Sequence, residues 1–189
     1  MKKVYFVTGN QMKVLVAQKA LETNEIELEQ VKIETPEIQS MDVKEVASFS
    51  AEWAANKLNK PVVKEDNAFC IEALDEFPGT FVAHIDKTIG ENGIMKLING
   101  IKNRKAKYVS AVSYCVPGGQ PIVEFEELEG VISENLEGEY GWFSDKFFIP
   151  NGYGKTMGCY PDDERKMIWP HNFWKKLATR ILSEKNDGF

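Results

Sequence analysis

The first segment that could do chemistry lies near the N-terminus, where a short apolar stretch gives way to residues 8–13, Thr-Gly-Asn-Gln-Met-Lys. The first backbone amides of a helix have no partner within it and therefore attract anions. Gly9 lets the backbone approach a ligand closely, and Lys13 adds a mobile positive charge. The pattern predicts a phosphate-binding loop, although it lacks the spacing and the second glycine of a Walker A motif. A plain tight turn with a solvated lysine is the alternative.

Acidic residues mark a second candidate site, at the end of the apolar stretch 61–66. Glu65 and Asp66 are neighbours there, and Glu37 follows an earlier predicted strand. Open α/β sheets bind ligands beyond the carboxyl ends of their strands. Carboxylate oxygens suit a hard cation such as Mg²⁺, which keeps several waters and needs few protein ligands. We therefore predict a Mg²⁺ site at Glu37, Glu65 and Asp66, with a solvated acidic turn paired to Lys64 as the alternative.

Aromatic residues define a third candidate site, in residues 141–145, Gly-Trp-Phe-Ser-Asp. An aromatic ring can stack on a nucleobase, and a carboxylate can accept a base N–H. The alternative is a pair of core aromatics beside an aspartate that caps a turn. His84 and His171 each lack a second histidine nearby for a zinc site, so a structural or surface role is the simpler expectation for both.

The elements that must position these residues follow from the spacing of apolar side chains. Strands are predicted over residues 3–8, 26–33, 61–66, 108–116 and 121–128, with a further strand and loop over 130–141. Helices are predicted over 12–21, 43–58, 89–101 and 171–185, with a helix start at 161–164 that Pro170 interrupts. Asp42 is a plausible N-cap for the second helix, and a Pro-Gly-Gly turn makes 108–128 a β-hairpin. Strands and helices alternate in the first part of the chain, and strands follow one another in the later part. This order predicts an α/β protein with a mixed sheet.

Composition narrows the class of protein. The 189 residues are 43% hydrophobic and 28% charged, as in a soluble globular protein. The net charge is −6 and no Lys/Arg run exceeds two residues, so a nucleic acid polymer is not an expected partner. No stretch approaches the length of a membrane span, and the first apolar run is too short for a signal peptide. Cys70, Cys115 and Cys159 form no CxxC pair, so we expect reduced thiols and a cytoplasmic location.

The ordered set of motifs resembles the Ham1-like inosine triphosphatase family, over nearly the whole chain. Any one motif is weak, and the specificity lies in their order and spacing. The segments that carry the resemblance are Thr8-Gly9-Asn10-x-x-Lys13, Pro36-Glu37-Ile38-Gln39, Pro61-Val62-Val63-Lys64-Glu65-Asp66-Asn67, Ala73-Leu74, Phe77-Pro78-Gly79, Gly141 to Asp145, Gly152-Tyr153-x-x-Thr156 and Lys166 to His171.

The resemblance implies one domain over residues 1–189, built as an elongated mixed β-sheet flanked by helices, with two lobes and a central cleft. It also implies a homodimer that uses Mg²⁺. The implied reaction cleaves a non-canonical purine triphosphate, such as ITP, dITP or XTP, between its α and β phosphates and releases the monophosphate and pyrophosphate.

The resemblance also assigns roles by position. Asp66 matches the acid that serves as base or metal ligand, with Glu37 and Glu65 as the rest of the acidic cluster. Lys13 matches a catalytic lysine that contacts the triphosphate, together with Thr8 and Asn10. The other implied substrate contacts are Asn67 beside the substrate and, in the nucleobase pocket, Trp142, Phe143, Ser144, Asp145, Lys166, His171 and Asn172. We expect Lys13 and the three acids to face one another across a single groove.

This sequence departs from the family pattern at three places. The family has His-Arg where this chain has His171-Asn172, and a Phe-Gly-(Tyr/Trp)-Asp-Pro segment where this chain has residues 142–146, Trp-Phe-Ser-Asp-Lys. It has a lysine on the second helix where this chain has Ser50, on a face predicted to point inward. Loss of a positioned donor can relax discrimination for a carbonyl at the purine six position. We therefore expect a base preference that is shifted or relaxed relative to ITP.

Two functions follow from these residues. The first is an Mg²⁺-dependent nucleotide pyrophosphatase, in which lysine holds the leaving pyrophosphate and an acid aims the water. The second is a nucleotide-binding regulatory protein on the same scaffold with little catalysis. Serine at position 50 favours the second, whereas retention of Lys13 and the acids favours the first.

Overall fold

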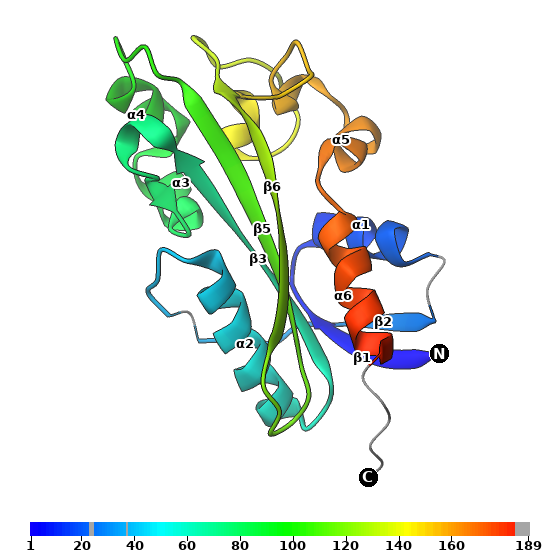
Figure 1. The fold of residues 1–189 in the computed structure, drawn as a ribbon. Helices are drawn as coiled ribbons and strands as arrows, with labels where there is room; N and C mark the ends of the chain where they lie inside the picture. Colours follow the sequence, from blue (N-terminus) through cyan, green and yellow to red (C-terminus); the bar gives the residue numbers. More distant parts are fainter. Residues whose placement is uncertain (23–24, 37, 184–189) are drawn as a thin grey trace. The chain divides into compact units, whose positions relative to one another are not determined.

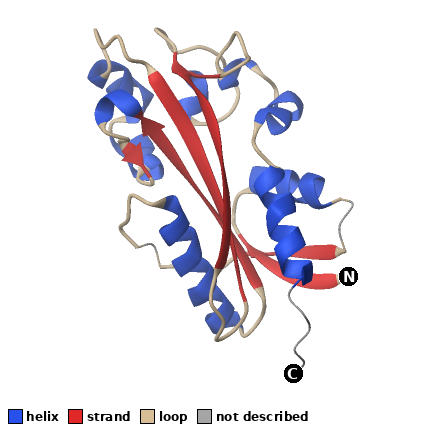
Figure 2. Ribbon diagram, viewed as in Figure 1, coloured by secondary structure: helices blue, strands red, loops and turns tan. Residues whose placement is uncertain are grey.

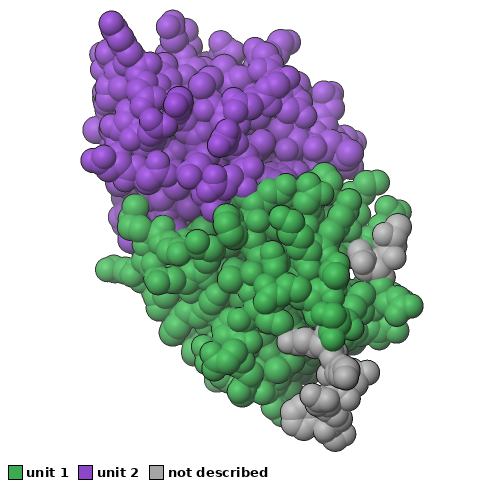
Figure 3. All heavy atoms as spheres, viewed as in Figure 1, with its two compact units in different colours: residues 1–66, 110–126, 171–189 green, residues 67–109, 127–170 purple. Residues whose placement is uncertain are grey.

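The structure is a computed structural model that describes residues 1–22, 25–36 and 38–183 (Figure 1). The chain divides into two compact units, each assembled from segments that are distant in sequence (Figure 3). Unit 1 comprises residues 1–66, 110–126 and 171–189, and unit 2 comprises residues 67–109 and 127–170.

The described residues form a seven-stranded mixed sheet, in which the strand order is β2-β1-β3-β5-β6-β7 and β4 pairs with β3 (Figure 2). The strands are β1 (Lys2–Val7), β2 (Ile26–Val31), β3 (Val62–Ile71), β4 (Pro78–Gly79), β5 (Lys105–Cys115), β6 (Ile122–Ile132) and β7 (Phe148–Pro150). β1 is parallel to β2 and β3, whereas β4 is antiparallel to β3 and β7 is antiparallel to β6. The predicted α/β fold with a mixed sheet is confirmed.

Helices flank this sheet. They are α1 (Gln11–Leu21), α2 (Val43–Leu58), α3 (Val82–Thr88), α4 (Gly90–Leu97), α5 (Asp162–Ile168) and α6 (Asn172–Ser183), with a 3₁₀ helix η2 over Phe143–Lys146. α2 has the predicted bounds and the predicted N-cap, because Asp42 Oδ1 accepts a hydrogen bond from the Lys44 amide at 2.9 Å. Among the described helices, none has the length and apolar character needed to cross a membrane.

The sheet of unit 1 is covered on both faces. Phe6 and Val63 belong to one apolar cluster with residues of α1 and α6, including Trp174. Val7 and Val62, the neighbours of these two residues along β1 and β3, belong to a second cluster with residues of α2. Since successive side chains of a strand point to opposite faces, odd-numbered residues at the start of β3 face α1 and α6, and even-numbered residues face α2.

Unit 2 has an aromatic core of its own. Phe69 on β3 packs edge-on against Phe147 and Phe148, and Tyr108 on β5 packs against Phe148 and Trp169. Edge-to-face rings fill such a core while aligning the positive rim of one ring with the negative face of another. This core fixes η2, which carries much of the third candidate site, against β3 and β5.

Two strand predictions need correction. The strand expected to end at Asp66 continues to Ile71, because residues 68–71 are all buried and extend the strand past the acids. The strands expected over 121–128 and 130–141 are not separate, because β6 runs without a break through Gly130 to Ile132. A Cβ at Gly130 would lie 2.2 Å from the Ile149 carbonyl oxygen, so the glycine allows β7 to approach rather than ending the strand. β5 and β6 are neighbours in the sheet and confirm the hairpin.

The helix predicted over 89–101 is also wrong in its extent. α4 ends at Leu97, and a second short helix, α3, precedes it. Gly90 has φ +62°, a left-handed conformation that separates the two helices. The sequence pattern does not predict α3, because its seven residues show too little apolar periodicity, with Val82 as the only fully buried position.

Candidate active site

Lys13 lies against the acidic stretch of β3 within unit 1. Its ammonium donates a hydrogen bond to the Glu65 backbone oxygen at 3.0 Å and lies 3.8 Å from Glu65 Oε1. The other carboxylate oxygen of Glu65 accepts a hydrogen bond from Trp174 Nε1 at 3.1 Å. The Glu65 side chain is 6% exposed. Burial raises its pKa, and Lys13 and the Trp174 N–H oppose that rise.

The N-terminus of α1 is capped by its own chain. Asn10 Oδ1 accepts hydrogen bonds from the Met12 amide at 2.9 Å and the Lys13 amide at 3.4 Å. Thr8 Oγ1 in turn accepts from the Asn10 amide at 3.1 Å. These bonds use amides that the sequence pattern makes candidates for phosphate binding, and they shape the loop through contacts within its own segment. The substrate contacts assigned to Thr8 and Asn10 therefore stay predictions.

Asp66 lies on the opposite face of β3 from Glu65. The Glu65 side chain points to the face of Val63, where α6 supplies Trp174. By strand alternation the side chain of Asp66 points to the face of Val62, which α2 covers. Asp66 is partly exposed, whereas Glu65 is buried. The expectation that Lys13 and the acids face one another across a single groove therefore needs correction, because Lys13 contacts Glu65 whereas the Asp66 side chain points to the opposite face of β3.

The predicted metal ligands are only partly covered by the structure. Glu37 lies outside the described residues. Within the ranges that are described, no group of three or more His, Cys, Asp or Glu side chains is arranged to hold a metal ion. Ser50 is 1% exposed on α2, which confirms the predicted inward orientation.

The third candidate site lies in unit 2, and its residues differ sharply in exposure. Trp142 is 44% exposed, whereas Phe143, Ser144 and Asp145 are all buried. Phe143 packs with Phe147 in the aromatic core. Only Trp142, of these four predicted base contacts, presents much of its surface to solvent. Asn67, the small polar residue predicted beside the substrate, is also in unit 2 and is partly buried on β3.

Asp145 is the centre of a buried polar network. Its Oδ2 accepts hydrogen bonds from Arg165 Nη1 and from the Trp142 amide, both at 2.9 Å. Tyr108 lies 3.4 Å from Asp145 Oδ1 and hydrogen-bonds to Ser144. Burial raises the pKa of Asp145 even though the Trp142 amide and Arg165 lower it, and burial also raises the pKa of Tyr108.

Arg165 is a residue of this buried network that the motifs did not indicate. It is 5% exposed and pairs with Asp145, whereas its neighbour Lys166 pairs with the exposed Asp163 within α5. The sequence feature that could have indicated Arg165 is its spacing of three residues from Ile168. These two residues are the buried ones of α5 and lie on one face of that helix. An arginine on an apolar helix face implies a buried acid nearby.

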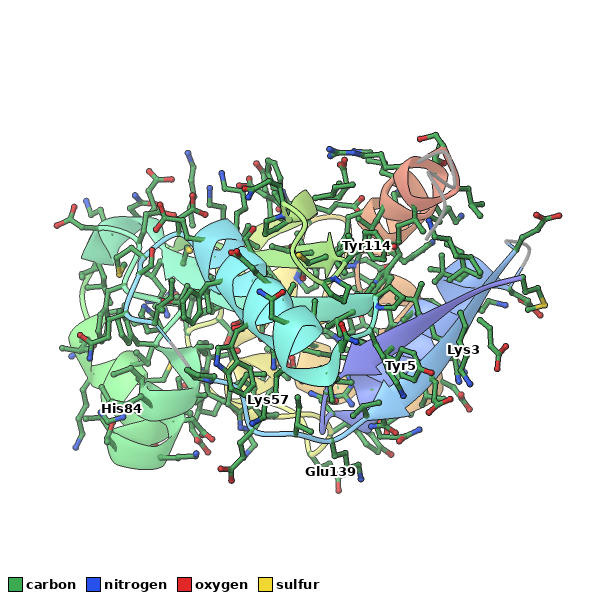
Figure 4. The ribbon with its side chains drawn as sticks, turned by 90° about the horizontal axis from the view of Figure 1, so that it is seen from below. Lys3, Tyr5, Lys57, His84, Tyr114 and Glu139 are labelled. Carbon is green, nitrogen blue, oxygen red and sulfur yellow. The ribbon has the colours of Figure 1, made fainter. Side chains whose placement is uncertain are left out.

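His171 and Asn172 belong to unit 1 and not to the unit that holds Trp142. Asn172 Nδ2 donates to Glu126 Oε1 at 3.1 Å, and the amides of Asn172 and Phe173 donate to Glu126 Oε2 at 2.9 and 3.2 Å. The Glu126 carboxylate thereby caps the N-terminus of α6. His84 is exposed on α3, as expected for a surface histidine (Figure 4).

Comparison with solved structures identifies the class of fold. A HAM1 protein from Coxiella burnetii matches 96% of this chain and 99% of its own with a TM-score of 0.81 at 19% identity. The Staphylococcus aureus Ham1 protein matches 97% of this chain and 100% of its own with a TM-score of 0.78 at 24% identity. At these identities the match establishes a shared Ham1-type fold.

The sequence itself establishes the family. It matches the Ham1 family over residues 4–171, so the chain belongs to that family. A dITP/XTP pyrophosphatase from Methanopyrus kandleri is 44% identical over 88% of each chain. A dITP/XTP pyrophosphatase from Thermococcus kodakarensis is 36% identical over 88% of this chain and 89% of its own.

Proposed function

We propose that this protein is an Mg²⁺-dependent nucleoside triphosphate pyrophosphohydrolase that converts a purine triphosphate to its monophosphate and pyrophosphate. The observation that carries the proposal is the contact of Lys13 with β3 at Glu65, the residue that precedes Asp66. We propose that the Lys13 amine binds phosphate there. Membership of the Ham1 family and the names of its dITP/XTP pyrophosphatase relatives support it.

The chain's own residues divide the work of hydrolysis. The oxygen of the attacking water bonds to the α phosphorus while Asp66 accepts a proton from that water. The bond between the α phosphorus and the bridging oxygen breaks, and pyrophosphate leaves with that oxygen. Lys13 neutralises negative charge on the departing pyrophosphate. Glu65 holds Lys13 through its backbone oxygen and its buried carboxylate, so the ammonium is oriented before substrate arrives. A bound Mg²⁺ would neutralise phosphate charge and align the polyphosphate.

The donor set fits Mg²⁺ held by few protein oxygens. Asp66 offers a partly exposed hard carboxylate, and Mg²⁺ usually keeps several waters beside one or two such ligands. Glu65 fits the ion less well, since its carboxylate is buried between Lys13 and Trp174. We therefore assign the metal to Asp66, with Glu37 as a further ligand, and propose that Glu65 positions Lys13.

A pyrophosphate-release assay over ITP, XTP, dITP and the canonical triphosphates, with and without Mg²⁺, tests the proposal. We expect Mg²⁺-dependent release, with a base preference shifted or relaxed relative to ITP because Asn172 and Ser144 replace family residues. An exclusive preference for ITP and XTP would refute the altered preference. A regulatory protein with little catalysis would release no pyrophosphate from any substrate. The single domain, homodimer and cytoplasmic location stay predictions.

Replacing Gly9 with alanine tests whether the loop before α1 receives the triphosphate. A Cβ at Gly9 meets no atom within 4 Å, and the backbone there is not left-handed, so the fold does not itself require glycine. We expect Gly9→Ala to keep or slightly raise the melting temperature and to raise KM about tenfold by obstructing the phosphates, a cost of roughly 1.4 kcal/mol. Gly154→Ala is the matched control, because its Cβ also meets no atom within 4 Å. Equal KM values for the two variants would place the phosphates elsewhere.

A further inference from the structure

Residues 142–146, the segment that departs most from the family pattern, form hydrogen bonds to other elements of unit 2. Three of the departing side chains in this segment each form a hydrogen bond to a different element of unit 2. The contacts are Trp142 Nε1 to Asp86 Oδ2 on α3 at 2.6 Å, the Ser144 hydroxyl to Tyr108 on β5, and Lys146 Nζ to Glu91 Oε1 on α4 at 3.1 Å. The substituted residues are therefore integrated into the structure by specific hydrogen bonds, which is not expected of a motif that has lost its role.

Trp142 is held at both ends while much of its surface stays accessible. Its amide donates to Asp145 Oδ2, and its indole N–H donates to the Asp86 carboxylate. The Phe143 ring lies 5.6 Å away at an interplanar angle of 48° and limits rotation on one side. The side chain nevertheless remains 44% exposed. A large exposed ring that is fixed by a charge-assisted hydrogen bond is suited to stacking against a planar ligand.

We propose that Asp86 is a positioning residue that holds the Trp142 ring as the stacking face for the purine base. The inference rests on the proposed function and adds a residue to it. A ring that is already oriented loses little freedom when the base binds, so Asp86 acts on affinity and not on the chemical step. The phenylalanine that the family pattern has at this position has no N–H, so Asp86 can act in this way only with tryptophan.

The first test follows the indole N–H signals by two-dimensional NMR in the full chain. The chain has four tryptophans, and loss of one signal in Trp142→Phe assigns the signal of Trp142. We expect Asp86→Ala to move that signal, because the hydrogen bond is lost, and Asp86→Asn to move it less, because an amide oxygen still accepts. Inosine monophosphate, which has no α–β phosphate linkage to cleave, should shift the Trp142 signal of the wild type and bind more weakly to Asp86→Ala.

The second test compares steady-state constants. We expect Asp86→Ala to raise KM about three- to tenfold with kcat nearly unchanged, the size of effect that ordering one side chain produces. Asp86→Asn should recover most of the loss, and Asp86→Ala should have no further effect in a Trp142→Phe background. If Asp86→Ala changed kcat alone, or raised KM equally in the Trp142→Phe background, the positioning role would be overturned.

The outcomes separate this inference from the proposed function. If the wild type hydrolyses no triphosphate but inosine monophosphate still shifts the Trp142 signal in an Asp86-dependent way, the proposed function fails and the inference stands. If the wild type hydrolyses triphosphates but Asp86→Ala leaves the Trp142 signal or the binding of the monophosphate unchanged, the inference fails and the function stands.

Discussion

Replacing Asp66 with asparagine should lower kcat by about 10²- to 10⁴-fold, the usual contribution of a positioned general base. Asparagine keeps the size of the side chain, so the melting temperature should change little. The measurement is pyrophosphate release at saturating substrate. Glu134→Gln, which neutralises an exposed carboxylate in unit 2, serves as the control and should retain full activity. Turnover near wild type in Asp66→Asn would end the assignment of Asp66.

The dependence on Mg²⁺ distinguishes the two roles of Asp66. If its carboxylate holds the metal, Asp66→Asn should raise the Mg²⁺ concentration that gives half-maximal activity, because a neutral amide is a weaker ligand. If it acts only as the base, that concentration should stay constant while kcat falls. Glu65→Gln should leave the Mg²⁺ requirement unchanged, because that carboxylate faces Lys13 and Trp174.

Replacing Arg165 with methionine should lower the free energy of unfolding by about 3–5 kcal/mol, the usual cost of leaving one member of a buried ion pair without its partner. Arg165 and Asp145 are both buried and their charged atoms lie 2.9 Å apart. Chemical unfolding at pH 7.5 measures the loss. Lys166→Met removes the same charge from the next residue, whose partner Asp163 is 90% exposed, and should cost much less. Equal losses in the two variants would show that the buried pair is not special.

The cost of Arg165→Met should grow with pH. The pKa of Asp145 is raised by burial, and loss of the Arg165 cation raises it further. A group whose pKa is higher in the folded state stabilises that state below its unfolded pKa, and the contribution disappears as pH rises through the folded value. The variant should therefore approach wild-type stability near pH 4 and lose most at pH 8. Asp145→Asn added to Arg165→Met should remove this dependence, and a loss independent of pH would contradict the interpretation.

The hydrogen-bond networks around Glu65 and around Asp145 have different consequences for function. Glu65 orients Lys13 in unit 1, so replacing Glu65 should change the catalytic rate. Asp145 closes the turn that carries Trp142 in unit 2, so its loss should release the ring that Asp86 holds. In both cases a buried acid keeps a partly exposed group in one orientation, which is the general requirement for a preorganised site.

The local features of this protein follow from the sequence by itself. Apolar periodicity determines α2 and its Asp42 cap, and glycine with a following helix start marks the loop before α1. The ordered motifs also identify the family. These signals are local because helix periods, caps and turns involve residues only a few positions apart.

Only the tertiary structure decided the partners of the charged groups. Trp174 contacts Glu65 across 109 positions in the chain, and Arg165 contacts Asp145 across 20. Burial also decided which aromatic of the 142–143 pair stays exposed, and strand alternation placed Glu65 and Asp66 on opposite faces of β3. The physical reason is that the energy of a buried charge depends on the neighbours that folding brings to it, and residue spacing does not specify those neighbours.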